Sequence, residues 1–440
     1  MIASIASARQ NSAPARAIAS RSTILAAALT GMLCLPAQAQ RAPTDSARAA
    51  ADSLAVRLRR AEEAIALLQQ QLGEQASSGT TAHSRMQLEL NGRVLMHTFF
   101  NDASVNNVDD PQFARPDAPS AQPGTSLGSA IRQTTLGLVV TSRDVLGGRF
   151  VGDVDVDFFG GQQPSAGGRT FPLLRLRTAR GAVRWAHGEL LVGQESPLIA
   201  GLNPVSPAAI GTPAFVTAGN LWLWLPQLRA TVERGSSVRI ALQGALLANT
   251  NGDAAAPFDT DTDPAERTAL PATEARLRVR WGEDALASEI GCGGHLGWID
   301  LPAGRHTTYA SACDARIAMS SVELRGEAYI GRGLRGLGGG GISQNVSRIG
   351  VPLEDRGGWL QVNYDATALV KLGAGCGIDE PRSADVAPAG RLRNSACSGY
   401  TIVRPAGPLF FGAEYRRIST KYTSGTFANN HVNLAMGFEF

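Results

Sequence analysis

The sequence predicts an all-β chain: a transmembrane antiparallel β-barrel of about 16 strands, preceded by a short N-terminal coiled-coil helix. From Met86 to Phe440, short segments alternate apolar and polar residues, a period typical of strands that face two different surroundings. The connections between them alternate in length. "SRDVLGG" and "ERGSS" are short, whereas 101–130, 195–219, 248–270 and 332–357 are long. Outer-membrane barrels have short periplasmic turns and long outer loops in this way.

Residues 1–39 are predicted to be a signal peptide. Three arginines precede the apolar run "ILAAALTGMLCL", and "AQA" at 37–39 supplies small residues for cleavage. A transit peptide is the alternative, because the segment is rich in Ser, Ala and Arg. Cleavage would remove three of the 41 basic residues, which leaves 38 against 38 acidic residues. This balance gives no support to a nucleic-acid partner.

Residues 40–75 are predicted to form a periplasmic coiled coil, joined to the barrel at 86–440 by a linker at 76–85. Small and aliphatic residues follow a heptad pattern. The a positions are Ala51, Leu58, Ile65 and Leu72, and the d positions are Ala47, Leu54, Ala61 and Leu68. A single amphipathic helix packed on its own domain is the alternative. The flexible stretch "GEQASSGTTAHS" that follows favours an oligomeric coil.

Sixteen candidate strands follow one another along the rest of the chain. They begin near Met86, Arg132, Gly148, Leu173, Glu189, Trp222, Ser237, Thr273, Ala285, Thr307, Val322, Gly358, Ala368, Asn394, Pro408 and Asn429. The last, "HVNLAMGFEF", alternates up to the final residue and must close the barrel against the first. Its aromatic residues Phe438 and Phe440 resemble the signal that outer-membrane barrels present to their assembly machinery. The terminal strand of a soluble β domain is the alternative.

The polar faces of several strands carry ladders of charge. A charge facing lipid at the bilayer midplane costs about 2–4 kcal/mol, so three on one strand would cost on the order of 6–12 kcal/mol, comparable to the net stability of a domain. We therefore expect these side chains to line the pore: Arg93, Asp153, Asp155, Asp157, Arg175, Arg177, Arg276, Arg278 and Arg280. They would either create a transverse field that orients polar solutes or simply brace the wall.

Two long connections suggest further roles. The segment 195–219 is rich in proline and weakly charged, and we expect it to fold inward and narrow the channel, with an external loop as the alternative. The run "DTDTD" at 259–263 is interpreted as a solvated acidic loop rather than a calcium site. No metal site and no cofactor is predicted. The sequence contains no HExxH motif, and no enzyme activity is predicted.

Four cysteines remain after the predicted cleavage, which removes Cys34. They are Cys292, Cys313, Cys376 and Cys397, and an even number in an exported chain suggests disulfides. The pairs 292/313 and 376/397 would each flank an outer loop, so that hairpin geometry brings their members together. Four free thiols are the alternative.

Several segments occur in an order that resembles DcaP-like trimeric porins and, more distantly, the phosphate-selective porins O and P. They include "IRQTTLGLVVTS", "GDVDVDFFGG", "LRLRTARG", "LRGEAYIGRGLRGLGGGG" and "FGAEYRRISTKY". The resemblance covers 86–440 and implies a sixteen-stranded homotrimer in which Arg175 and Arg177 line a pore for small anionic solutes. A lysine-rich ladder of the phosphate-selective type is absent from the sequence.

The sequence thus predicts a porin of the bacterial outer membrane, in contact with outer-membrane lipid, that lets small polar, anionic solutes diffuse through a trimeric channel. The alternative is a non-conducting barrel with an adhesive or envelope-tethering role. Bulky apolar residues facing the lumen would favour that alternative.

Overall fold

The computed structural model describes residues 86–117, 124–160, 172–252, 262–283 and 286–440. The predicted signal peptide, coiled coil and linker lie outside these residues. The described part is almost entirely strand. The strands are β1 Met86–Asn101, β2 Ser126–Ala130, β3 Thr135–Val145, β4 Gly148–Asp157, β5 Arg175–Trp185, β6 Gly188–Glu195, β7 Leu225–Gly235, β8 Val238–Leu247, β9 Ala272–Trp281, β10 Ser288–Leu301, β11 Gly304–Met319, β12 Val322–Arg332, β13 Glu354–Asp365, β14 Val370–Pro381, β15 Arg391–Val403, β16 Leu409–Tyr422 and β17 Gly425–Glu439.

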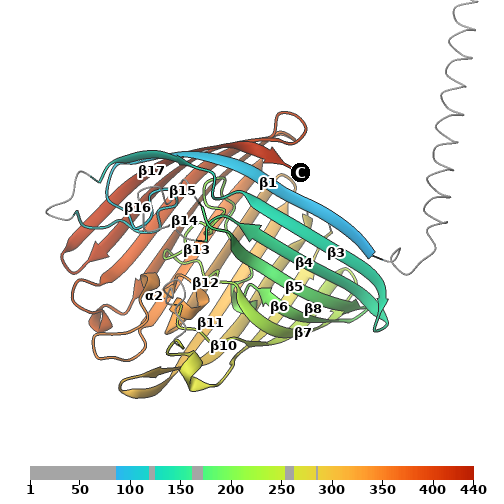
Figure 1. The fold of residues 1–440 in the computed structure, drawn as a ribbon, viewed down its shortest axis with the longest axis horizontal. Coiled ribbons are helices and arrows are strands. Elements are labelled where there is room, and N and C mark those ends of the chain that lie inside the picture. Colours follow the sequence, from blue (N-terminus) through green and yellow to red (C-terminus); the bar gives the residue numbers. More distant parts are fainter. Residues whose placement is uncertain (1–85, 118–123, 161–171, 253–261, 284–285) are drawn as a thin grey trace, which may run out of the picture. The chain divides into compact units, whose positions relative to one another are not determined.

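The strands form one closed antiparallel barrel (Figure 1). From β3 to β17 each strand pairs with its successor, and β17 returns to pair with β1. Both β2 and β3 pair with β1, one after the other along its length, because residues 131–134 interrupt the strand between them. Together they fill one position in the wall, so the barrel has 16 positions, as the sequence predicted.

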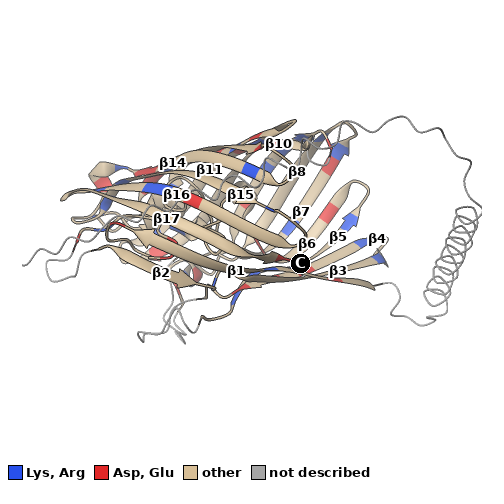
Figure 2. Ribbon diagram, turned by 90° about the horizontal axis from the view of Figure 1, so that it is seen from above, with Lys and Arg blue, Asp and Glu red and all other residues tan. Residues whose placement is uncertain are grey.

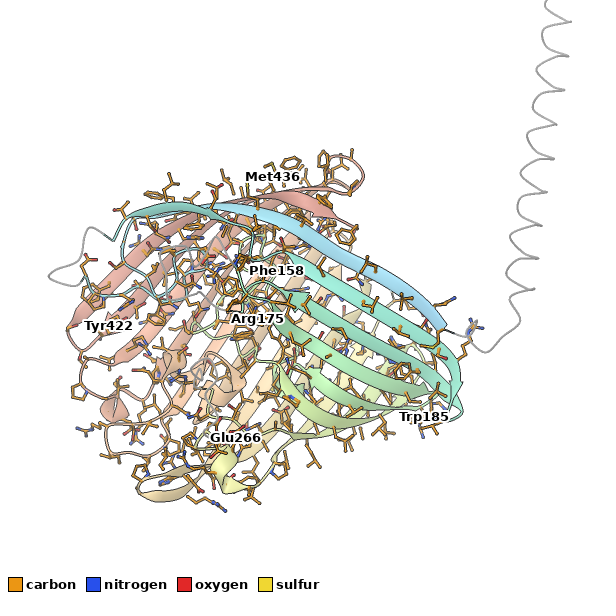
Figure 3. All side chains as sticks on the ribbon, viewed as in Figure 1. Phe158, Arg175, Trp185, Glu266, Tyr422 and Met436 are labelled. Atoms are coloured by element: carbon orange, nitrogen blue, oxygen red, sulfur yellow. A yellow bond between two sulfur atoms is a disulfide. The ribbon has the colours of Figure 1, made fainter. Side chains whose placement is uncertain are left out.

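Helical turns are few and short in the described part. They are η1 Leu198–Ala200, η2 Glu266–Thr268, η4 Leu334–Leu337, α2 Gly340–Ser343 and η5 Ser383–Asp385, all in the long connections. Among the described residues, no helix has the length and apolar character needed to cross a membrane. Short turns such as 146–147 and 236–237 gather at one end of the barrel. Figure 3 places Trp185 at that end and Tyr422 at the opposite end.

The C-terminal strand closes the barrel against the first strand, as predicted. Met436 lies opposite Met96 on β1, and Phe438 lies opposite Val94. The backbone of Phe440 both accepts a hydrogen bond from the amide of Gly92, at 2.9 Å, and donates one to its carbonyl, at 3.0 Å. The last residue of the chain is therefore part of the wall rather than a frayed end.

The outer face of the barrel is apolar. Large hydrophobic side chains remain exposed on nearly every strand, with Leu90, Leu242, Leu360 and Leu434 each more than half exposed. Each of them alternates with a polar or small residue that faces inward. A closed barrel with such a belt satisfies its backbone hydrogen bonds internally and presents apolar surface to lipid. The protein is accordingly a transmembrane barrel.

Candidate functional site in the barrel lumen

The predicted ladder of β4 and β5 forms a row of ion pairs on the inner face. Arg175 contacts the Asp157 carboxylate at 2.6 Å. Arg177 contacts Asp155 at 3.2 Å and Asp157 at 3.7 Å. Asp153 instead pairs with Arg180, at 2.7 Å, a residue that the sequence analysis missed. The alternation of β4 brings all three aspartates to one face, and β5 supplies the cations.

A β-bulge explains why Arg180 was missed. The register of β5 shifts between the pairs Asp155↔Thr178 and Val156↔Leu176, which leaves Arg177 as an extra residue. A bulge of this kind reverses the alternation beyond it. Strict alternation from Arg175 would turn Arg180 toward lipid, whereas the bulge lets it reach the carboxylate of Asp153. Figure 2 shows basic segments interspersed with acidic ones in this part of the barrel.

The arginines of β9 also face inward, but they differ in their contact with water. Arg276 is only 7% exposed and pairs with Asp314 on β11 at 2.7 Å and with Glu289 on β10 at 2.9 Å. Arg280 contacts the same Glu289 at 3.3 Å and is 34% exposed. Arg278 pairs with Glu233 on β7 at 3.0 Å. Arg276 thus braces the wall, whereas Arg280 is accessible to a solute.

The last predicted pore residue, Arg93, lies near the end of the barrel where the chain terminates. It forms an ion pair with Glu439 on β17, which also pairs with Arg404 at 2.9 Å. The guanidinium group of Arg93 stacks over the ring of Phe410 at 4.8 Å. These contacts join β1 to β17 beside the closing hydrogen bonds of Phe440.

The connection between β6 and β7, residues 196–224, crosses the lumen. Polar side chains from strands around the wall hold its backbone. Gln133, between β2 and β3, accepts hydrogen bonds from the amides of Ile210 and Gly211 at 2.6 and 3.0 Å. On the other side, Gln361 of β13 both accepts from and donates to Val205, at 2.8 Å each. A loop bound to both sides of the barrel lies inside it, as the sequence predicted for 195–219.

Further strands hold the same loop. Its amides and carbonyls bond to Glu274 on β9, Glu327 and Arg325 on β12 and Asn394 on β15, with distances between 2.5 and 3.3 Å. Gly377 of β14 allows the closest approach, because a Cβ atom there would stand 2.0 Å from the carbonyl oxygen of Ala218. The loop is therefore held against the inner wall on several sides.

Apolar residues of the loop pack against the inner wall. Leu198, Ile199 and Leu221 lie in one buried cluster with Leu334 and Leu337 of the connection 333–353. A second cluster brings together Phe215 of the loop, Trp359 of β13 and Ile418 of β16. Bulky apolar side chains therefore do face part of the lumen, which the sequence analysis did not anticipate.

The connection between β1 and β2 also carries buried charges. Arg132 pairs with Asp109 at 2.5 Å and lies 3.8 Å from the centre of the Phe159 ring. Asp110 pairs with Arg416 at 3.3 Å. Burial of the Asp110 side chain raises its pKa to about 7, although Arg416 opposes this shift.

Toward the short turns, the lumen keeps an open depression of about 430 Å³ that is rich in arginine. Strands β5 to β9 line it. Its charged residues are Arg180, Arg184, Glu189, Arg229, Glu233, Arg278 and Arg280. Five arginines and two glutamates thus line it, and three further carboxylates, Asp153, Glu195 and Glu289, pair with Arg180, Arg278 and Arg280.

Both predicted disulfides are present. Cys292 bonds to Cys313 across β10 and β11, and Cys376 bonds to Cys397 across β14 and β15. Each pair lies directly opposite in the register. The neighbours Gly291 and Gly377 face the lumen, because a Cβ atom on them would meet Arg276 and Ala218. The sulfur atoms consequently lie on the lipid-facing side.

Within the described ranges, no three His, Cys, Asp or Glu side chains are grouped as metal ligands. Of the three aspartates in the run 259–263, only Asp263 lies in the described residues. It caps the turn at η2 by accepting hydrogen bonds from the amides of Ala265 and Glu266, at 2.6 and 2.9 Å.

Comparison with known proteins identifies this architecture. No family model matches the chain, and no curated protein matches it either. Among solved structures, the outer membrane channel DcaP of Acinetobacter baumannii has a TM-score of 0.63 and 17% identity, over 82% of this chain and 99% of that one. OprB of Pseudomonas putida has a TM-score of 0.51 and 9% identity, over 80% and 94% of the two chains. The chain has the fold of these outer-membrane barrels.

Proposed function

We propose that this protein is a porin that gives passive diffusion to small polar solutes and prefers anions. The observation that carries the proposal is the arginine-rich depression on β5–β9 of a closed barrel, where Arg229 also donates to the carbonyl of Ser196 in the inward loop. Field lines concentrate in a channel with low-dielectric walls, so arginine side chains that remain exposed to the lumen would raise the local concentration of anions.

The nine residues predicted to line the pore have different roles in this proposal. Arg280 is about one-third exposed and would meet the solute directly, as would Arg180, which lies outside the predicted nine and is exposed to the same extent. Arg175 and Arg276 would act indirectly, because carboxylates and backbone carbonyls already occupy their donors. Asp153, Asp155 and Asp157 would hold the arginines in place rather than attract cations.

We further propose that the chain acts as a homotrimer. The heptad pattern at 47–72 and the resemblance to trimeric porins support this proposal. A short coiled coil is marginal by itself, so the barrels would have to contribute to association. The barrel-assembly machinery would recognise the final aromatic residues, Phe438 and Phe440.

The test is conductance of the purified full-length protein in a planar bilayer. Under a tenfold KCl gradient, we expect a reversal potential that favours chloride. The double variant Arg180→Gln with Arg280→Gln should move that potential toward zero. Arg305→Gln with Arg382→Gln is the matched control, because it removes the same charge from ion pairs on the exposed rim. An unchanged reversal potential in the lumen variant would exclude the arginine-based selectivity.

A second function has a specific observation in its favour. The packed clusters of the loops 196–224 and 333–353 fill part of the lumen, as expected of a sealed barrel with a structural or adhesive role. Absence of conductance from protein that is demonstrably folded, as judged by heat-modifiable migration in a gel, would replace the porin proposal with this one.

A further inference from the structure

The lipid-facing side of the barrel carries an uneven distribution of charge near the ends of the strands that lead into the long loops. On β13 to β16, outward positions hold Arg356, Glu380, Arg393, Arg417 and Lys421. On β4 to β8, the corresponding outward positions are uncharged: Val156, Leu176, Val192, Leu228 and Leu246. The basic side chains are therefore confined to one part of the circumference.

The register places these cations next to one another. Arg393 lies opposite Lys421 across β15 and β16, and Arg356 lies opposite Glu380 across β13 and β14. On the antiparallel strands β14 and β15, Asp379 lies opposite Asn394. The residue after Asp379, which is Glu380, therefore lies beside the residue before Asn394, which is Arg393. We call this continuous row the outer basic row. It consists of Arg356, Glu380, Arg393, Arg417 and Lys421.

The outer basic row has more positive charge than the protein neutralises. Arg356 forms an ion pair with Glu380 at 2.7 Å. Arg417 donates to the Asn430 side chain at 3.1 Å, and Asn430 in turn bonds to Asp102. Arg393 and Lys421 form no ion pair with any acidic residue in the described part of the chain. These two adjacent cations repel each other, so an anion bound from outside the protein would stabilise the pair.

A groove of about 780 Å³ runs from this row toward the middle of the apolar belt. Arg356, Glu380 and Arg393 line one part of it. Ala328, Gly358 and the disulfide Cys376–Cys397 form a floor of small groups, with Ile330 and Leu360 among its apolar walls. No residue of the inward loops contributes to its lining, which agrees with a position on the lipid side.

We propose that the groove and the outer basic row bind one molecule of the phosphorylated glycolipid that forms the outer leaflet of a bacterial outer membrane. A phosphate group would lie between Arg393 and Lys421, and an acyl chain would lie along the groove. Basic residues at a membrane surface attract anionic headgroups in this way, and buried methylene groups add affinity. This inference depends on the position of the barrel in the outer membrane and not on conduction.

The test uses native mass spectrometry of the detergent-solubilised full-length protein, titrated with bisphosphorylated lipid A. We expect saturable retention of one molecule per protomer. The double variant Arg393→Gln with Lys421→Gln should weaken retention roughly thirtyfold, about fivefold for each cation. Arg143→Gln with Arg149→Gln is the matched control, since both residues are exposed at the opposite end of the barrel. The control should retain the lipid as the wild type does.

Two further arms separate the headgroup from the acyl chains. Dephosphorylated lipid A should bind weakly to the wild type, and inorganic phosphate should compete only at high concentration. Ala328→Phe should fill the groove and reduce retention of lipid A. The concentration of inorganic phosphate needed to displace the lipid should stay the same. Equal binding of the dephosphorylated lipid, or no effect of the Arg393 and Lys421 variant, would refute the proposal. Loss of oligomers in that variant with lipid retention unchanged would show that a second copy covers this face instead.

Discussion

Replacing Gln133 with alanine tests how the constriction loop is held. The side chain is 1% exposed and makes three hydrogen bonds to the loop. Its oxygen accepts from Ile210 and Gly211, and its nitrogen donates to the carbonyl of Ala208 at 2.8 Å. A hydrogen bond contributes about 1 kcal/mol net, so the variant should lose roughly 3 kcal/mol of loop anchoring.

That loss corresponds to a roughly hundredfold increase in the population of the released loop. Hydrogen-exchange mass spectrometry should therefore record faster exchange of the amides in 205–215, with the strands of the wall unchanged. Single-channel recordings should show greater current noise. Gln194→Ala is the control, because Gln194 bonds only to carbonyls of the wall, at Leu176 and Arg177. Unchanged exchange in a folded Gln133→Ala barrel would refute this account of the loop.

Three more predictions concern stability and assembly. Arg276→Met leaves Asp314 buried without its cation and should destabilise the barrel by about 3–5 kcal/mol, measured by urea unfolding in lipid vesicles. Because the pKa of Asp110 is raised, the folded protein keeps a proton that the unfolded chain releases as the pH rises. The free energy of unfolding should therefore fall between about pH 4 and about pH 7. Asp110→Asn should remove this dependence from the unfolding measurements over that pH range. Phe440→Ala should slow assembly, seen as delayed heat-modifiable migration after a pulse label, while a normal rate would show that the final ring is not part of the signal.

The sequence predicted the strands well because a membrane barrel imposes a strong physical pattern. Lipid on one side and a polar lumen on the other force a period of two, so the predicted starts at Gly148 and Val322 coincide with β4 and β12. The cysteine pairs followed from the same logic, since consecutive antiparallel strands place residues opposite each other.

The details of the lumen could not be predicted in the same way. The bulge at Arg177 inserts one residue without a distinctive sequence signal, and this was enough to hide the role of Arg180. The anchors of the inward loop, Gln133 and Gln361, are far from it in sequence and bind its backbone, which leaves no side-chain pattern to read. The only available hint in the sequence was a third arginine, Arg180, three residues after the "RLR" motif at 175–177.

The two disulfides have a consequence for how the wall is put together. A slip of one residue between neighbouring strands would turn every lumen-facing charge toward lipid. The covalent links at Cys292–Cys313 and Cys376–Cys397 forbid such a slip in two hairpins, which together make up a quarter of the 16 wall positions. Since their sulfur atoms face the bilayer, soluble thiol reagents cannot reach them once the barrel is in place. We therefore expect the oxidation that fixes the alignment to come before insertion into the membrane.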